Sequence, residues 1–220
     1  GNQTIAALGA RTTADGIVAG ANARFVSGGF DAAMSFAYDS SNADTTRPVP
    51  AAHDEQAHYK LRSTTFDVNI GYSMSLGKSL KLRPGVGFTS VQTKRGAATE
   101  FGSSGVFDFA LARDTYKANF IDGGLRIEST PANAAALHPW LDLGLRHLLD
   151  RDARFATGYL PGDVIGIKTA GAGRARTLTT VGAGFDLAVA RNVTLYASYG
   201  GAFGTGSSSS RVNGGIRMTF

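Results

Sequence analysis

The sequence predicts an all-β fold, an antiparallel up-and-down transmembrane β-barrel of about ten strands. Three observations support this prediction. Apolar and polar residues alternate in one segment after another, as they do in strands whose two faces meet different surroundings. The connections alternate between short turns and long polar loops, as in outer-membrane barrels. Glycine supplies 29 of 220 residues, which disfavours helices because each internal glycine costs a helix about 1 kcal/mol.

The alternation divides the chain into ten expected strands, which reach the roughly 9–11 residues that a tilted strand needs to cross a bilayer. They cover residues 4–15, 16–27, 29–42, 58–76, 80–100, 106–128, 136–156, 164–190, 193–205 and 209–220. The first is the weakest, because small residues occur on both of its faces. An even number of strands returns the chain to the side on which it began. We therefore expect both termini on the side of the short turns. We expect residues 1–220 to form a single domain.

The segment 64–89 shows the pattern most clearly. From Phe66 to Leu76 every second residue is apolar, and polar or small residues lie between them. The short turn 77–79 follows, and alternation resumes from Leu80 to Phe88. This predicts a hairpin. The same reasoning assigns the other strands from the apolar series Ile17–Phe25, Phe30–Tyr38, Ile121–Ile127, Leu141–Leu145, Val181–Val189, Val193–Tyr199 and Val212–Phe220.

Alternation alone fits two architectures. In a soluble sandwich the apolar faces pack inward, whereas in a transmembrane barrel they meet lipid and the polar faces line the lumen. The unequal connections and the charges of both signs on the polar faces favour the barrel. Aromatic residues also gather near strand ends, as two interfacial girdles require: Phe25, Phe30, Tyr38, Phe66, Phe88, Tyr199 and Phe220.

Composition excludes several other classes. The chain has no cysteine and therefore no disulfide scaffold or thiolate site. It has no run of about 18 apolar residues, so we expect no transmembrane helix. Its net charge of +5 is modest and scattered, which disfavours nucleic-acid binding. Gly182, Gly184 and Gly200 lack the strand and helix context of a nucleotide loop, and we expect them to face the lumen.

Charges of alternating sign on four C-terminal strands predict a lumen network that lines a hydrated pore or holds a helix or a chain in transit. Plain structural ion pairing is the alternative. Trp140 shares the lumen register and is expected either to constrict the pore or to fill space with its N–H satisfied. The predicted network comprises Asp122, Arg126, Asp142, Arg146, Asp186, Arg217 and Trp140.

The long loops suggest two further sites. His53, Asp54, Glu55 and His58 could form a metal or protease site, although a solvated loop explains them as well. We expect no catalytic residue, no metal and no cofactor. The last long loop re-enters the barrel near Arg174 and Arg176. These arginines could contact lipopolysaccharide phosphates. The alternative is a basic loop that is simply solvated.

Five stretches resemble the autotransporter β-domain, the translocator of type V secretion. They run in family order as LKLRPGVGFTSVQTKRGAATEFG, YKANFIDGGLRIES, LHPWLDLGLRHLL, TTVGAGFDLAVARNVTLYASYGGAFG and GGIRMTF, and together they extend from Leu80 to Phe220. The resemblance is weaker over residues 1–76. The last strand, with Ile216, Met218 and Phe220, looks like the signal that the outer-membrane assembly machinery reads.

The resemblance implies an outer-membrane location and the export of a passenger attached at the N-terminus. Some family members cleave their passenger at an asparagine, and Asn2 is compatible with such a cleaved product. The sequence departs from the family in showing ten strands where the family has twelve. No helix that would plug the pore is evident, unless residues 2–10 supply it. We expect a monomer.

Two other functions remain open from the residues. One is a free-standing outer-membrane barrel that acts as a narrow pore or binds partners through its long loops. The other is an outer-membrane hydrolase that uses residues at the rim around His53 and His58.

Overall fold

The computed structural model describes residues 2–5, 10–49, 53–102, 108–129, 137–150, 155–159, 166–170, 175–190 and 192–218. Its main sheet is antiparallel throughout, and neighbouring strands follow one another along the chain. The strands are β1 Asn2–Ile5, β2 Ala10–Ser27, β3 Phe30–Arg47, β4 Glu55–Tyr72, β6 Leu80–Arg95, β9 Asp114–Ser129, β10 Leu137–Leu148, β13 Thr177–Ala190, β14 Val193–Gly204 and β15 Ser207–Met218. The short β5, Met74–Leu76, pairs with β6. The predicted all-β, up-and-down antiparallel fold is therefore confirmed.

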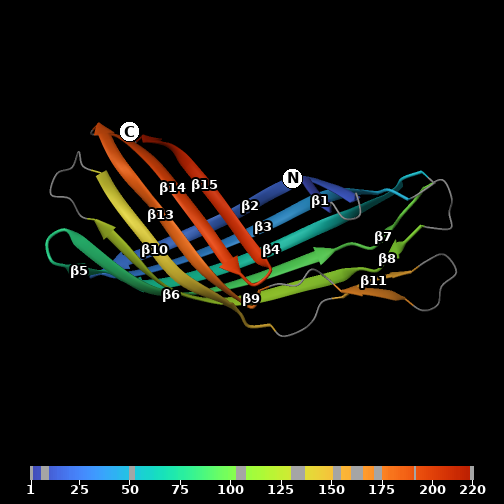
Figure 1. Cartoon of the computed structure of the whole chain (residues 1–220), viewed down its shortest axis with the longest axis horizontal. Helices are drawn as coiled ribbons and strands as arrows, with labels where there is room; N and C mark the ends of the chain where they lie inside the picture. Colours follow the sequence, from blue (N-terminus) through green and yellow to red (C-terminus); the bar gives the residue numbers. More distant parts are fainter. Residues whose placement is uncertain are drawn as a thin grey trace.

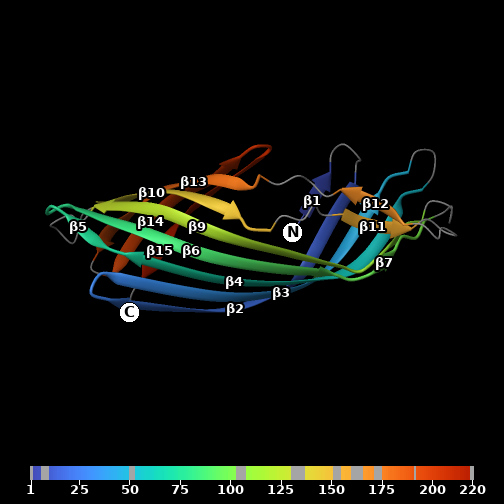
Figure 2. The same ribbon diagram turned by 90° about the horizontal axis from the view of Figure 1, so that it is seen from below.

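The sheet curls along this order, and β2 and β3 lie on the opposite side of the curl from β13 (Figure 1 and Figure 2). Two consecutive glycines with positive φ, Gly28 and Gly29, make the tight turn between β2 and β3. This turn and the connections that follow β5, β9 and β13 lie at one end of the strands, the short-turn end. The long connections after β3, β6 and β10 lie at the other, the outer end, which corresponds to the cell surface in barrels of this kind.

The long connections build a second, smaller sheet at the outer end. Its strands are β7 Ala98–Thr99, β8 Ala110–Leu111, β11 Phe155–Tyr159 and β12 Ile167–Ala170, in the order β12-β11-β8-β7. Backbone hydrogen bonds between Gln56 and Phe101 join it to the beginning of β4. We call this region the outer cap. The predicted strands at 106–128, 136–156 and 164–190 are shorter than expected, because parts of those ranges contribute to the cap.

The first two predicted strands, 4–15 and 16–27, have the wrong bounds, because β1 ends at Ile5 and β2 already begins at Ala10. β2 continues through Gly16 without a turn and pairs with β3 without interruption, from Arg11 opposite Thr46 to Ser27 opposite Phe30. Alternation cannot show where a strand ends, and Gly16 remains extended because its neighbours on β3 complete the ladder. The long β2 therefore begins at the outer end and β15 finishes at the short-turn end, so the expectation that both termini share one end is also wrong.

The sheet is open along one seam in the described part of the chain. β15 pairs with β14, and none of the described residues pairs it with β1 or β2. β1 covers only the first residues of β2, from Ala10 to Thr13. β2 and β15 run in the same direction, so an antiparallel ladder does not join them directly.

The apolar side chains lie on the outside of the curl. Val212 is 79% exposed and Ile17 is 78% exposed. Among the described residues, the buried apolar side chains are four alanines, at positions 43, 57, 98 and 118. A soluble protein buries large apolar side chains instead, so the soluble sandwich is excluded and the outward face is suited to lipid. No helix in the described ranges is long and apolar enough to cross a membrane.

The outward apolar band ends well before the outer ends of the strands. Its last members are Tyr38 on β3, Phe66 on β4, Phe88 on β6 and Ile121 on β9. Beyond these positions the outward face becomes polar, and on β3 it continues through residues 40, 42, 44 and 46 as Ser, Asn, Asp and Thr. The strands therefore extend past the membrane toward the outer cap. We call these parts the outer extension.

Candidate functional site on the inner wall

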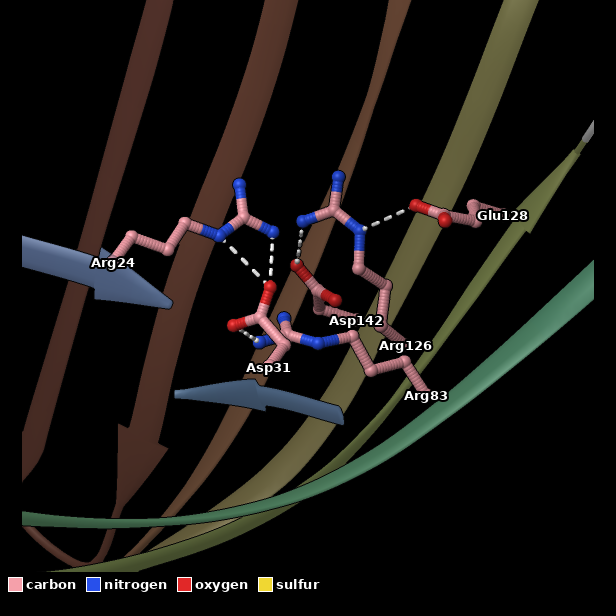
Figure 3. Close-up of polar contacts among 6 residues, drawn as sticks. All are labelled: Arg24, Asp31, Arg83, Arg126, Glu128 and Asp142. Atoms are coloured by element: carbon pink, nitrogen blue, oxygen red, sulfur yellow. Dashed lines mark hydrogen bonds and ion pairs between the residues drawn. The ribbon is translucent and has the colours of Figure 1, made fainter. Parts of the chain in front are cut away.

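One acidic side chain joins three strands on the inner wall near the short-turn end. Asp31 on β3 is 3% exposed and accepts hydrogen bonds from two arginines (Figure 3). Arg24 Nε on β2 lies 2.8 Å from Asp31 Oδ2, and the Arg83 guanidinium on β6 lies 2.6 Å from Oδ1. Arg83 reaches Asp31 across β4, where the intervening residue is Gly71. A Cβ at Gly71 would lie 2.9 Å from Arg83 Nε.

A second cluster surrounds Arg126 on β9. Its guanidinium lies 3.3 Å from Glu128 and 3.5 Å from Asp142 on β10 (Figure 3). It also stacks on Trp140 at 4.3 Å from the ring. The indole lies against Gly184 on β13, where a Cβ would come within 2.6 Å of the ring. Trp140 therefore lies along the wall and fills the space over glycine rather than projecting across the lumen.

A third set of contacts lies nearer the outer end. Arg146 Nε on β10 lies 2.6 Å from Asp122 Oδ1 on β9. The hydroxyl of Thr89 lies 2.6 Å from Asp67 on β4 and 3.5 Å from Asp122. These contacts link β4, β6, β9 and β10 by side chains as well as by their ladders.

A row of inward glycines separates the second and third sets. Gly71, Gly85, Gly124 and Gly144 are opposite one another across β4, β6, β9 and β10. We call this the glycine row. A hollow of about 220 Å³ lies here, and Arg83, Asp122, Arg126 and Asp142 are among the residues that border it. Gly71 is buried beneath Arg83, whereas Gly85, Gly124 and Gly144 leave backbone at least partly exposed between charged side chains.

The structure brings the six charged residues of the predicted lumen network together as three pairs. They are Asp122 with Arg146, Arg126 with Asp142, and Asp186 with Arg217. The last pair is loose at 3.9 Å, and Arg217 also lies 5.6 Å from the Tyr196 ring. The joint functional role of these residues remains a prediction. Sequence reasoning did not predict the cluster of Arg24, Asp31 and Arg83. The alternation does place each of these charged residues on the polar face of its strand.

The remaining predicted residues lie at the two ends of the strands. Ile216 and Met218 face outward and are exposed near the end of β15, while Phe220 lies outside the described residues. Arg176 is exposed, and its carbonyl accepts a hydrogen bond from the Leu148 amide. Arg174 also lies outside the described residues.

The alternation of β4 separates the residues of the suggested metal or protease site. Glu55 points inward and is fully buried, whereas His58 lies on the outward face, paired with Asp44 and 5.4 Å from the Phe101 ring. His53 is exposed before the strand. Within the described residues, no three His, Asp or Glu side chains lie close enough together to hold a metal ion.

Sequence reasoning also missed a buried acidic cluster beneath the outer cap. Arg47 lies 2.5 Å from Glu100, which also accepts a hydrogen bond from the Phe109 amide. Both oxygens of Glu55 and one oxygen of Asp108 are buried without a hydrogen-bond partner. Burial, and then the neighbouring carboxyl of Asp108, raise the pKa of Glu55. These residues come together only because the long loop between β6 and β9 folds back over β4.

A family model and solved structures of other proteins match this chain. The family model of the autotransporter β-domain matches residues 1–200. The translocator domain of the autotransporter NalP from Neisseria meningitidis has a similar fold, with a TM-score of 0.75 and 17% identity over 96% of this chain and 68% of that chain. The transport unit of AIDA-I from Escherichia coli aligns at 12% identity and a TM-score of 0.40, over 96% of this chain and 84% of that chain. No curated protein sequence matches the chain.

The match over residues 1–200 confirms the resemblance that the C-terminal strands indicated, and the NalP fold agrees with the curled antiparallel sheet. The family match and the outward apolar band together support the expected location in the bacterial outer membrane. Proteins of this class carry an attached passenger and are in general not enzymes. The chain belongs to the autotransporter β-domain family and is an outer-membrane translocator domain.

Proposed function

We propose that the inner wall guides the segment that connects the translocator to its passenger. The glycine row is the observation that carries this proposal. Without side chains, its backbone lets another chain approach closely. Charged side chains on both sides of the row hold water and offer donors and acceptors to a polar chain. The described inner face between these charges consists mainly of Gly, Ala, Ser, Thr and Asn, so a passing segment finds little apolar surface to bind.

The guiding role requires no covalent chemistry from this domain. Several acidic and basic groups of the inner wall form ion pairs, such as Asp122 with Arg146 and Asp31 with Arg83. Such pairs stabilise the wall and keep its charges in fixed positions. We propose that the domain anchors and passes its passenger without acting as an enzyme.

We also propose the other partners of the domain. Outer-membrane lipid covers the apolar band, and lipopolysaccharide contacts basic residues at the outer end, including Arg176. The outer-membrane assembly machinery reads the last strand, where Ile216 and Met218 are exposed on the outward face. We propose that residues 1–220 act as one domain and as a monomer.

A surface-display experiment tests the guiding role. A signal peptide and a small unstructured epitope are fused upstream of Gly1, and external protease is added to intact Gram-negative cells. We expect the protease to remove the epitope. A folded, heat-modifiable barrel in the outer membrane whose epitope stays protected would contradict the proposal.

Two glycine substitutions make the test specific to the lumen. A Cβ at Gly200, which faces inward on β14, or at Gly123, which faces outward on β9, meets nothing within 4 Å. The Cβ of Gly200→Phe therefore has free space, and its ring narrows the lumen, whereas Gly123→Phe adds the same ring on the lipid side. We expect slower display for Gly200→Phe alone. Equal display by both variants, with both barrels folded, would argue against passage along this wall.

A further inference from the structure

Four basic side chains gather on the outward face of the outer extension. Lys60 and Arg62 lie on β4, Lys94 on β6 and Lys117 on β9, and all four are exposed. The strands are neighbours in the order β4-β6-β9. The four residues share the outward alternation with Phe66, Phe88 and Ile121 of the apolar band. We call them the basic patch.

The register brings like charges face to face. Arg62 is directly opposite Lys94. Lys117 is two residues from Thr115, which is the partner of Lys94 on β9. Side chains directly opposite in an antiparallel pair lie about 4.5–5.5 Å apart at Cβ, diagonal ones about 7–8 Å, and like charges so placed destabilise a sheet. The ion pairs among the described residues include none of the four.

Acidic groups near the patch are few. Asp44 on β3 is already paired with His58, and Asp150 accepts hydrogen bonds from the backbone and side-chain nitrogens of Asn119. Asp15 is exposed on β2, two strands away from Lys60. The other outward positions beside the patch on β4, β6 and β9 carry neutral groups that can donate hydrogen bonds: Thr64, Ser90, Gln92, Thr115 and Asn119.

The patch lies immediately above the membrane. Arg62 is four residues beyond Phe66, and Lys117 is four residues beyond Ile121. Four residues span about 13 Å along a strand, or about 10 Å in height at a tilt of roughly 40°. The headgroup layer extends about 5–7 Å beyond the hydrocarbon on each side. Long lysine and arginine side chains bend toward that layer while their stems stay on the protein surface.

We propose that the basic patch binds the phosphate groups of a phosphorylated glycolipid in the outer leaflet, the chemistry of the lipopolysaccharide anchor. Phosphate oxygens placed between Arg62 and Lys94 would relieve a repulsion that nothing else in the described chain offsets. Arg62 offers the planar pair of donors that suits phosphate, and the two lysines on β6 and β9 add point charges. The neighbouring hydroxyl and amide groups can bind the sugar. This inference deepens the lipid partnership proposed above and is independent of passenger export.

A lipid is favoured over a soluble anion because of where the patch lies. The basic patch is on the outside of the curl, directly above the apolar band, so a ligand that contacts both must itself have an apolar and a phosphorylated part. Free phosphate would gain nothing from the band. The outward position also separates this site from the inner wall.

The test measures glycolipid binding to the folded barrel in neutral detergent by native mass spectrometry. The probe is a bisphosphorylated diglucosamine glycolipid, compared with the same glycolipid after removal of its phosphates and with inorganic phosphate as a competitor. The test variant carries Arg62→Gln, Lys94→Gln and Lys117→Gln. Because each cation near a charged lipid surface contributes about fivefold, we expect binding to weaken on the order of 100-fold.

A matched variant loses the same charge elsewhere. Arg11→Gln, Lys78→Gln and Arg211→Gln remove three exposed cations from the beginning of β2, a short turn and the inward face of β15. We expect this control to bind like the wild type. The gel shift on heating establishes that each barrel is folded.

Three results of the binding experiment would overturn the proposal. Equal binding by the test variant and the wild type would show that the patch is not the site. Equal binding of the dephosphorylated glycolipid would show that phosphate is not recognised. Full competition by inorganic phosphate at equal phosphate concentration would assign the site to a soluble anion. A wild-type chain that folds without detergent or lipid would refute the membrane embedding together with this inference, whereas failed surface display alone would leave it standing.

Discussion

Arg83 on β6 binds Asp31 on β3 by lying across Gly71 of the strand between them. The ion pair measures 2.6 Å, and the Asp31 carboxylate is almost completely buried. The contact thus joins strands that share no ladder, because the curl of the sheet turns their inner faces toward each other. It depends on the absence of a side chain at Gly71.

We predict that Gly71→Ala destabilises the barrel. The added Cβ would lie 2.9 Å from Arg83 Nε and displace the guanidinium from Asp31. Asp31→Asn should cost more, about 2 kcal/mol, because it removes the charged partner of two arginines. The measurement is the temperature at which the folded band disappears on unboiled gels. Gly123→Ala is the control, since a Cβ there meets nothing within 4 Å. Identical transitions for Gly71→Ala and Gly123→Ala would show that the Arg83 contact carries no stability.

The alternation of residues was sufficient to predict the faces of the strands and much of the inner wall. It placed Asp122, Arg126, Asp142 and Arg146 on one face, and adjacent strands then bring opposite charges together. It could not show that β2 continues through Gly16, since a glycine in an extended strand and a glycine in a turn look alike in sequence. Contacts that skip a strand, such as Arg83 with Asp31, depend on curvature, which local alternation does not encode.

The outer cap should loosen as the pH rises. The folded state raises the pKa of Glu55 above its ordinary value of 4.5, through burial and the nearby carboxyl of Asp108. A group with a raised pKa in the folded state contributes stability that is present at low pH and is lost as the pH passes the raised value. Asp108 and Glu100 face Glu55 as like charges, and Arg47 opposes them only in part.

Glu55→Gln keeps the neutral form at every pH, so its cap should stay closed where the wild-type cap opens. The measurement is amide hydrogen exchange in residues 96–102, given as the ratio of wild type to variant at each pH. We expect equal protection near pH 4 and faster wild-type exchange at alkaline pH. Asp54→Asn, which neutralises an exposed neighbour, serves as the control. A ratio that does not change with pH would refute a proton-dependent cap.

Removal of the Arg126 guanidinium should expose Trp140. The stacked contact at 4.3 Å covers one face of the indole, while Gly184 lies beneath the ring. Arg126→Gln should raise acrylamide quenching of the single tryptophan, and the lost cation–π contact should cost about 0.5–1 kcal/mol. Arg211→Gln removes another inward arginine, from β15, and provides the comparison. Unchanged quenching in Arg126→Gln would show that the ring is shielded by the wall alone.

Adjacent residues of β15 should respond in opposite ways to a new charge. Val212 faces outward and is 79% exposed, whereas Asn213 faces inward opposite Ser198 of β14. Arginine on the lipid face costs about 2–4 kcal/mol at the bilayer midplane and less toward the interfaces, while the lumen tolerates charge. Val212→Arg should therefore lower the folding stability in lipid vesicles far more than Asn213→Arg does. Urea titration of both variants in the same vesicles measures the difference. A larger loss of folding stability for Asn213→Arg would show that lipid contacts the face that carries Asn213. The assignment of inner and outer walls would then have to be reversed.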